Sequence, residues 1–576
     1  MIADPSVGVP SQILVELAKV SRGGGKSRLK CAPGAMNRSL LELSGCTGGP
    51  LVYGGRQFIP ETPMHNLKSY LSGSWHSGTD STLVNPMNGE AVAQCGSSGL
   101  DLGAAVTYGQ DVGGPALRAM SFTERAAMLK GLAAAVHEIR DELLDLARIN
   151  GGNTRGDGKF DVDGATGTLA AYASFGKRLG DRPYLNDGDT VQLGRTARFS
   201  GRHVRVPRPG VAVHINAFNF PAWGMLEKAA CAWLAGVPVI SKPGTSTALV
   251  AWRVAEQIVA SGLVPEGAFQ FLCGSAGDLL DHLGPMDGVA FTGSAQTGLK
   301  IKSHPNVLAQ NVRVNIEADS LNGAVLDGDI EPGEETWNLA LLNIATDMTQ
   351  KAGQKCTAVR RIVIPENLVD QFAEDLVAEL KRFPVGDPAD RVNRVAPVAH
   401  PGQFDDVKSG MAKLLEVSDV ICGGLPEKEG EALLVQPTLL KATDSEASVL
   451  HELEVFGPVA TLIPYDGTRS EAIRLCNRGG GGLVCSLYSD NAKWAEEVVL
   501  GVAPWHGRVW IGSKRMAEQA LAPGMVLPAM VHGGPGRAGG GEELGGLRGL
   551  DFYTQRVALE GFSGLLDQRF GPAEQD

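Results

Sequence analysis

Three residue types that could act together in covalent chemistry stand at separate points of the chain. Asn219 precedes Phe220-Pro221, Glu317 ends a β-branched run, and Cys356 follows Gly353-Gln354-Lys355. A cysteine thiolate can attack an aldehyde, giving a thiohemiacetal whose hydride passes to a nicotinamide ring and leaves a thioester. An amide can hold the oxyanion of such an adduct, and a carboxylate can serve as the base. Together the three types indicate a nucleophile, an oxyanion donor and a base.

Each type taken alone has an ordinary structural interpretation. A free cysteine is usually a small buried hydrophobe, which we expect for Cys231, Cys273 and Cys485. Small and polar residues surround Cys356, so both interpretations stay open for that thiol. Glu317 alone is equally consistent with a solvated carboxylate at the end of a strand.

The composition limits the classes of function. The 576 residues predict two or more compact units with a substantial core. A net charge of −12 argues against binding to nucleic acid or to an anionic membrane surface. The nine cysteines form no CxxC pair, which predicts a reducing compartment and no structural metal. The sequence contains no apolar run of about 18 residues and no cleavable apolar start, so the cytoplasm is the expected location.

Strands and helices alternate through the centre of the chain. Strands are expected at 211–215, 237–240, 268–272, 288–291 and 312–316, with helices at 221–233 and 245–260. This order predicts a parallel sheet with right-handed crossovers, and ligands bind at the carboxyl ends of such strands. Asn219, Lys242, Gly293 and Glu317 all follow an expected strand. A helix at 337–347 leads to Cys356, and a strand at 359–364 begins a second α/β lobe.

Segments at the edges of this pattern have separate interpretations. Residues 1–63 are glycine-rich and predict a weakly ordered extension; translation beginning at Met64 is an equal alternative, and a targeting peptide is a weaker one. Residues 198–208 and 552–559 interrupt the alternation and are expected to form an arm that pairs with a partner subunit. The segment 532–546 contains a literal GxGxxG, but proline interrupts it and no helix follows. A loop folded over the site entrance is the expectation there.

The ordered set of motifs resembles the aldehyde dehydrogenase superfamily over about residues 66–560. The motifs are Asn219-Phe220-Pro221, Lys242-Pro243, Phe291-Thr292-Gly293-Ser294 with Gly298, Gly353-Gln354-Lys355-Cys356 and Glu454-Val455-Phe456-Gly457-Pro458. The resemblance implies an α/β fold with a Rossmann-like cofactor domain (64–196 and 210–323), a catalytic domain (324–540) and an oligomerisation arm (197–209 and 548–562). It also implies a homodimer or a larger homo-oligomer.

The resemblance assigns roles to the residues of these motifs. Cys356 would be the nucleophile, Asn219 with the Cys356 amide would hold the oxyanion, and Glu317 would activate water. Ala318-Asp319-Ser320 replaces the glycine pair that usually follows this glutamate. Relatives that pass the acyl group to free coenzyme A typically lack this base, so Glu317 favours hydrolysis to an acid.

Six residues would bind the cofactor. Gly293 and Ser294 would offer backbone amides to the diphosphate, and Lys242 would reach the adenosine ribose. Relatives that prefer NAD commonly carry a glutamate where this chain has Thr245, so NADP is expected and NAD is the alternative. Glu454 would contact the nicotinamide ribose, and Phe456 would help to position the nicotinamide half of the cofactor.

Three segments resemble one branch of the superfamily. That branch acts on coenzyme A-linked semialdehydes in aerobic phenylacetate or benzoate degradation, and the segments similar to it are Val213–Pro221, Glu317–Asn322 and His532–Gly546. The resemblance therefore implies oxidation of such a semialdehyde to its acid. A dehydrogenase that acylates coenzyme A, and a non-catalytic binding protein with the same fold, are the two alternatives.

Overall fold

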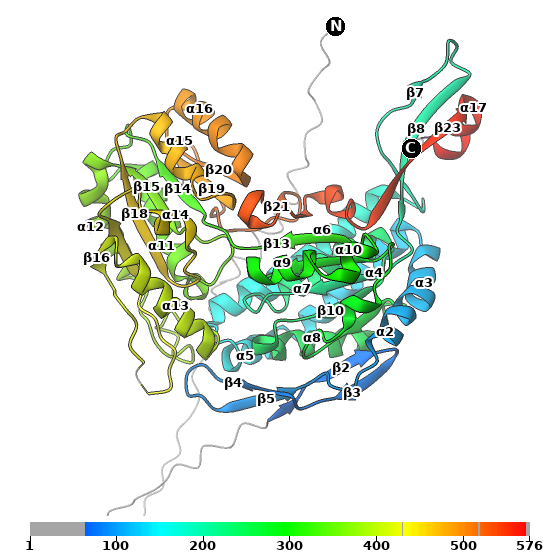
Figure 1. Ribbon diagram of the computed structural model, residues 1–576, viewed down its shortest axis with the longest axis horizontal. Coiled ribbons are helices and arrows are strands. Elements are labelled where there is room, and N and C mark those ends of the chain that lie inside the picture. The colour runs from blue at the N-terminus through cyan, green and yellow to red at the C-terminus, as the bar shows by residue number, and fades with distance from the viewer. Residues whose placement is uncertain (1–63, 429, 517–518, 572–576) are drawn as a thin grey trace, which may run out of the picture. The chain divides into compact units, whose positions relative to one another are not determined.

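The structure is a computed structural model that describes residues 64–428, 430–516 and 519–571. The expectation for residues 1–63 lies outside this range. Between residues 64 and 571, apart from the short gaps, no helix has both the length and the apolar character needed to cross a bilayer. Two seven-stranded sheets and a smaller antiparallel sheet carry most of the strands (Figure 1).

The first large sheet has a parallel core. Its order is β13 (Arg313–Glu317), β12 (Gly288–Thr292), β9 (Ala212–Ile215), β10 (Val239–Lys242), β11 (Phe269–Phe271), β2 (Lys68–Leu71) and β3 (Ser74–Ser77). The five strands from β13 to β11 pair in parallel, whereas β2 and β3 are antiparallel additions. A three-stranded sheet of β1 (His65–Asn66), β5 (Ala91–Cys95) and β4 (Ser81–Val84) precedes this core in sequence.

Alternate side chains of these strands enter different hydrophobic clusters. Ala212 and Val239 pack in a cluster with helices of the first half of the chain, and Val213 and Ile240 belong to another. The helices with residues in the first cluster include α4 (Phe122–Glu138), α5 (Arg140–Ile149), α6 (Arg155–Leu179), α7 (Trp223–Ala235) and α8 (Ala248–Ser261). The second cluster includes residues of α2 (Leu102–Tyr108), α9 (Ala295–Lys302) and α10 (Pro305–Ala309). A strand that is buried on both faces has a nearly continuous run of apolar residues. The sequence therefore predicted the ends of these strands to within about two residues.

Both predicted helices near the cofactor motifs begin later than expected. Helix α7 begins at Trp223 rather than Pro221, because the buried carboxylate of Asp161 accepts hydrogen bonds from the amides of Ala222 and Trp223 at 3.2 and 2.7 Å. The segment from Thr245 first makes a 3-10 turn to Thr247, and α8 follows.

The second large sheet has helices of the later half of the chain on both faces. Its order is β16 (Ser418–Cys422), β17 (Thr438–Ala442), β18 (Val459–Tyr465), β15 (Arg361–Pro365), β14 (Gly323–Leu326), β19 (Gly482–Tyr488) and β20 (His506–Gly512), parallel except for β16. Residues of α11 (Glu335–Thr349) and α12 (Val369–Leu380) pack in one cluster. The other contains residues of α13 (Pro401–Leu414), α14 (Ser448–Glu452), α15 (Arg469–Asn477) and α16 (Ala492–Val502).

The extended arm combines two distant segments. β8 (Phe199–Pro207) pairs antiparallel with β23 (Thr554–Phe562) along nine residues, so that the two lie side by side (Figure 1). The short strands β6 (Leu185–Asn186) and β7 (Val191–Gln192) also pair with β8, and α17 (Ser563–Phe570) follows β23.

The glycine-rich tail is a hairpin packed against β13 rather than a simple loop. β21 (Val531–Gly533) pairs with β22 (Glu542–Leu544), and the amides of Ala318 and Gly541 donate to Ala538 O and Ile316 O. A Cβ at Gly539 would lie 2.4 Å from the carbonyl oxygen of Ile316. Glycine is required at this point because only a bare backbone can approach the edge of β13 so closely.

Candidate functional site

The loop that presents Cys356 has a strained backbone. It leaves α11 through Lys351 and Ala352, whose φ angles are 55° and 52°, followed by Gly353 at 68°. Left-handed conformations are costly for residues with a side chain and persist only where the surroundings enforce them. The Lys351 amide donates to the buried carboxylate of Asp157 at 2.9 Å. This bond connects the loop to α6.

Buried polar side chains fix the rest of this loop. The ammonium group of Lys355 is 2.8 Å from the carboxylate of Asp347, and both side chains are almost inaccessible. The guanidinium of Arg360 donates to the carbonyls of Gly353 and Lys355. Asn322 Nδ2 donates to Cys356 O at 2.7 Å. These bonds hold the backbone on both sides of the thiol, which favours a single position for Sγ.

The structure brings Cys356, Glu317 and Asn219 to one narrow cavity. Residues from both halves of the chain line it: Phe160, Ala217, Asn219, Phe220, Trp223, Gly224, Glu227, Lys228, Thr292, Glu317, Cys356, Thr357, Gly524, Val526 and His532. Asn219 Nδ2 donates to Gln354 O at 3.0 Å, so its amide is directed by the loop that carries Cys356. Glu317 is buried, which excludes the solvated strand-end interpretation. Cys231, Cys273 and Cys485 are buried as well.

His532 is a site residue that the sequence reasoning missed. Its Nε2 lies 3.8 Å from Cys356 Sγ and 3.1 Å from a carboxylate oxygen of Glu317. The residue sits in β21 of the tail hairpin, far from the other site residues in sequence. A single histidine in a glycine-rich segment has no periodic or motif signal. Only the segment as a whole carried a signal, namely the resemblance to enzymes that act on coenzyme A-linked semialdehydes.

Charge interactions couple the three groups. Burial opposes the negative charge of Glu317, but His532 and Lys228 outweigh this effect, and the pKa of Glu317 falls to about 2. Burial also opposes a charged imidazole, yet Glu317 and Cys356 raise the pKa of His532 well above its ordinary value. Burial and the Glu317 carboxylate raise the pKa of the Cys356 thiol to about 11, while His532 acts in the opposite direction. A protonated thiol therefore faces an ionised carboxylate that is paired with an imidazolium.

Further charges lie beside this cavity. Lys228 Nζ is 3.1 Å from Glu543 and 3.4 Å from Glu227. Burial raises the pKa of Glu227 to about 7, although Lys228 opposes that shift. Burial disfavours the charge of Lys228, but Glu543 and Glu227 more than compensate and raise its pKa.

The six residues expected to bind the cofactor lie outside the lining of this cavity. Lys242 ends β10, and Thr245 begins the 3-10 turn, where its hydroxyl donates to Gly274 O at 3.4 Å. Burial lowers the pKa of Lys242, and the only described groups that counteract this shift are the thiols of Cys273 and Cys95. The groups that oppose this shift are therefore thiols rather than carboxylates.

The start of α9 is partly occupied by the protein's own groups. The Gly293 amide donates to Glu317 O at 3.1 Å, and the Ala295 amide donates to Asp319 Oδ1 at 2.9 Å. Ser294 is the exposed N-cap residue, and its hydroxyl accepts a bond from the Thr297 amide. A carboxylate thus lies at the helix end where the sequence predicted a diphosphate.

Glu454 and Phe456 lie beside the Arg360 side chain. Glu454 accepts a hydrogen bond from the Ser320 amide at 3.0 Å and lies 3.6 Å from Arg360 Nε. Burial raises the pKa of Glu454 to about 7, and Arg360 opposes the shift. The Arg360 guanidinium also lies over the Phe456 ring, 5.3 Å from its centre. Arg360 therefore links this pair to the Cys356 loop.

The chain is similar to known proteins over most of their length. The 3,4-dehydroadipyl-CoA semialdehyde dehydrogenase of Aromatoleum evansii is 43% identical over 478 residues, covering 81% of this chain and 93% of the relative. Succinate-semialdehyde dehydrogenase (NADP+) of Escherichia coli is 26% identical over 75% of this chain and 87% of its own. The crystal structure of betaine aldehyde dehydrogenase from Staphylococcus aureus with NAD+ has a similar fold, with a TM-score of 0.74 at 23% identity over 87% of this chain and 95% of that chain.

These comparisons agree with the motifs and with the arrangement of the two large sheets. Residues 75–558 match the aldehyde dehydrogenase family, and this range covers the parallel core of the first sheet, the whole second sheet and the cavity around Cys356. The expected α/β aldehyde dehydrogenase fold is confirmed. The chain therefore belongs to the aldehyde dehydrogenase family and is an NAD(P)-dependent aldehyde oxidoreductase.

Proposed function

We propose that this enzyme oxidises a coenzyme A-linked semialdehyde, of the kind formed in aerobic benzoate or phenylacetate degradation, to the free acid with NADP. The observation that carries the chemistry is the convergence of Cys356, Glu317 and Asn219 on one cavity. The substrate class rests on the 43% identity with the Aromatoleum evansii enzyme and on the segments Val213–Pro221 and His532–Gly546.

The reaction begins on Cys356. Its thiol gives its proton to solvent water, the sulfur attacks the aldehyde carbon, and the carbonyl oxygen becomes an oxyanion held by the Asn219 amide and the Cys356 backbone N–H. One such donor contributes about 3–4 kcal/mol in comparable sites. NADP, when bound, supplies the hydride acceptor that converts the thiohemiacetal into a thioester. Glu317 then takes a proton from water, whose oxygen attacks the thioester and releases the acid and the thiol.

Site residues outside the reacting centre would hold the dinucleotide. Thr292 Oγ1 is buried beside the cavity without a hydrogen-bond partner in the described chain, which fits a polar ligand at that point. Lys242 and Thr245 would bind the adenosine ribose and its 2′-phosphate, since neither contributes a negative charge. Gly293 and Ser294 would lie at the diphosphate, and Glu454 and Phe456 at the nicotinamide half.

The catalytic roles are tested with two variants and one aldehyde substrate. With saturating NADP and 3,4-dehydroadipyl-CoA semialdehyde, Cys356→Ser is expected to lose NADPH formation. Glu317→Gln is expected to keep a first burst of NADPH and then turn over slowly, because acylation proceeds while hydrolysis is impaired. Persistence of the parental rate in Cys356→Ser would remove the thiol from the mechanism.

The acyl acceptor and substrate are tested on the parental enzyme. Turnover without added coenzyme A is expected, whereas a strict requirement for free coenzyme A would favour the acylating alternative. The semialdehyde of the phenylacetate route and a simple short-chain aldehyde serve as comparison substrates, each with NADP and with NAD. Equal kcat/KM for the simple aldehyde would contradict the coenzyme A-linked substrate class without affecting the roles of Cys356 and Glu317.

A further inference from the structure

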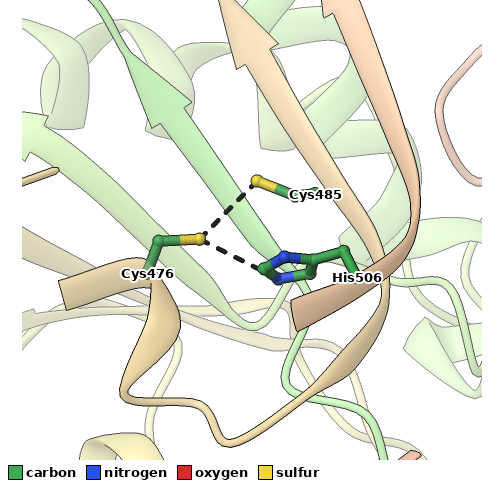
Figure 2. A group of neighbouring side chains, drawn as sticks. All are labelled: Cys476, Cys485 and His506. Atoms are coloured by element: carbon green, nitrogen blue, oxygen red, sulfur yellow. Dashed lines mark hydrogen bonds between the residues drawn. The ribbon is translucent and has the colours of Figure 1, made fainter. Parts of the chain in front are cut away.

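A second group of potential ligands lies in the core of the later α/β lobe. Cys476 from α15, Cys485 from β19 and His506 at the start of β20 face one another (Figure 2). Cys476 Sγ is 3.6 Å from Cys485 Sγ and 3.9 Å from His506 Nε2, and the three atoms all lie within 4.8 Å of one another. Their residues are 1%, 0% and 7% exposed. None of them lines the cavity around Cys356.

The two separations that involve Cys476 are close to those that a shared cation imposes. With metal–sulfur bonds of about 2.3 Å and metal–nitrogen bonds of about 2.0–2.1 Å in a tetrahedral arrangement, two sulfurs lie about 3.8 Å apart. A sulfur and a nitrogen then lie about 3.6 Å apart. The observed distances of 3.6 and 3.9 Å differ from these values by only a few tenths of an ångström.

The histidine is oriented as a metal ligand would be. His506 Nδ1 donates to the carbonyl oxygen of Val502 at 2.9 Å, which leaves the lone pair of Nε2 directed toward the thiols. Metal-binding histidines almost always fix their tautomer by such a bond from the other ring nitrogen. The Val502 oxygen thus occupies Nδ1, and Nε2 has only sulfur as a partner in the described chain.

Glycines leave space around the sulfurs. Gly323 and Gly482 are the strand neighbours of Cys485 and His506 in the sheet. A Cβ at Gly323 would lie 3.3 Å from Cys476 Sγ, and one at Gly482 would lie 3.5 Å from His506 Nε2. A side chain at either glycine would therefore press on the cluster, and three protein ligands leave one position of a tetrahedral ion for a small fourth ligand.

We propose that Cys476, Cys485 and His506 bind one d10 cation, Zn2+ or Cu+, at a site separate from catalysis. Two thiols lose their protons on binding, and a divalent ion with two thiolates and a neutral imidazole gives an uncharged buried site. The cation would fix α15 to β19. β19 in turn donates the Val484 amide to Asn322, whose side chain holds Cys356 O. Its role is therefore structural support for the strand beside the catalytic loop.

The test must separate this site from the catalytic one, because Glu317, Cys356 and His532 also lie within metal-binding distance of one another. The full-length Cys356→Ser protein, purified under reduction and free of metal, is the parent for the measurement. It is loaded with Zn2+ or with Cu+ in separate arms, desalted and analysed by mass spectrometry of the metal. About one ion per chain is expected to remain, and the arm with the higher retention identifies the ion.

Further variants locate the ligands. Adding Cys476→Ser or Cys485→Ser is expected to abolish retention, whereas adding Cys422→Ser, a half-buried cysteine elsewhere in the same lobe, leaves it unchanged. Circular dichroism establishes that each variant folds. If the serine variants do not fold, Co2+ bound to the folded parent gives the deciding measurement. Strong thiolate-to-cobalt charge-transfer absorption supports the site. Absence of that absorption, or equal metal retention in the folded serine variants, overturns the proposal.

Discussion

At the scale of single residues, the thiol of Cys356 is governed by two neighbours with opposite effects. Glu317 and burial raise its pKa to about 11, and His532 lowers it. The proposed mechanism needs the Cys356 thiolate for attack and the Glu317 carboxylate for hydrolysis, yet the two negative charges repel each other. His532 lies close to both groups and weakens the effect of this repulsion, because its positive charge stabilises both anions.

Replacing His532 by glutamine should make the thiol less acidic. The pKa of His532 is raised, so it is cationic at neutral pH and stabilises the thiolate there. Without this charge the pKa of Cys356 rises further, and at a pH below the pKa the thiolate fraction falls about tenfold for every increase of about 1 in that pKa. Alkylation of Cys356 by iodoacetamide at pH 8 is expected to slow on the order of tenfold. Its pH profile should move to higher pH.

A matched control distinguishes this electrostatic effect from general loss of structure. His304→Gln removes a half-buried histidine from a part of the chain outside the cavity, and its alkylation profile should equal that of the parent. An unchanged profile in His532→Gln would show that the imidazole does not act on the thiol. A lower rate with the same pH dependence would indicate altered access rather than altered acidity.

The sequence predicted three of the four residues that converge at the site. Asn219 and Glu317 follow strands of one parallel sheet, and such strands share a carboxyl edge, so their proximity follows from the alternating pattern. Cys356 was predicted from the local motif that surrounds it. His532 depends on the tail hairpin folding back onto β13, a contact between residues more than 200 positions apart. No local pattern encodes such a contact, which is why the sequence indicated a loop at the entrance instead.

At the scale of elements, the two crossovers that follow β10 and β12 would determine cofactor use. Each begins with a short connection at the carboxyl edge of the sheet, where backbone amides and side chains face a ligand. The sequence located both connections but not their hydrogen bonds. Asp319, which lies after β13, reaches the first turn of α9, and sequence spacing alone could not place that carboxylate there.

A carboxylate at position 245 should shift preference from NADP to NAD. Thr245 lies in the turn after β10, close to Lys242 in sequence and without a charge of its own. A glutamate there would repel a 2′-phosphate; at about 4 Å the repulsion between unit charges is about 1–4 kcal/mol in a surface environment. Thr245→Glu is therefore expected to raise the KM for NADP tenfold or more and to change that for NAD much less.

The control for this exchange places the same charge on the next residue. Ser246→Glu changes the charge of the same 3-10 turn at a different point. A smaller effect on the KM for NADP is expected in this variant. Equal effects of the two substitutions on the KM for NADP would indicate a long-range electrostatic effect rather than contact with the 2′-phosphate. No effect of Thr245→Glu would show that this residue does not determine the choice between NADP and NAD.

Removing the charge of Asp319 should strengthen binding of the cofactor diphosphate. The carboxylate accepts a bond from the Ala295 amide at the start of α9, where the helix dipole also favours an anionic ligand. Since each charge at such a position contributes about 0.3–1 kcal/mol, Asp319→Asn is expected to lower the KM for NADP about two- to fivefold. Cofactor titration of the Cys356→Ser background by fluorescence measures binding without turnover. Weaker binding in Asp319→Asn would mean that the carboxylate supports the site instead of competing for it.

At the scale of the whole molecule, the arm of β8 and β23 has an unpaired edge. In the described chain the sheet order is β23, β8 and β6, so β23 has a strand on one side only. Phe562 at its end is 61% exposed, and Val557 near its middle is 38% exposed. Exposed, apolar edge strands pair readily with another chain unless a charge prevents it. We propose that this edge joins two copies of the chain.

Charge on this edge should therefore separate the copies. The double substitution Val557→Lys and Phe562→Lys replaces two apolar contacts by like charges, which destabilise pairing across a two-fold interface. Light scattering after size exclusion is expected to show a concentration-dependent shift from oligomer toward single chains. Gln555→Lys adds one such charge at an exposed position of β23 without removing apolar surface, and a smaller shift is expected. A parental protein that is already a single chain, or a double variant with unchanged mass, would show that assembly does not depend on this edge. The arm does not contribute a residue to the Cys356 cavity. Single chains are therefore expected to keep the alkylation rate of Cys356, which would show that the catalytic loop is built within one copy.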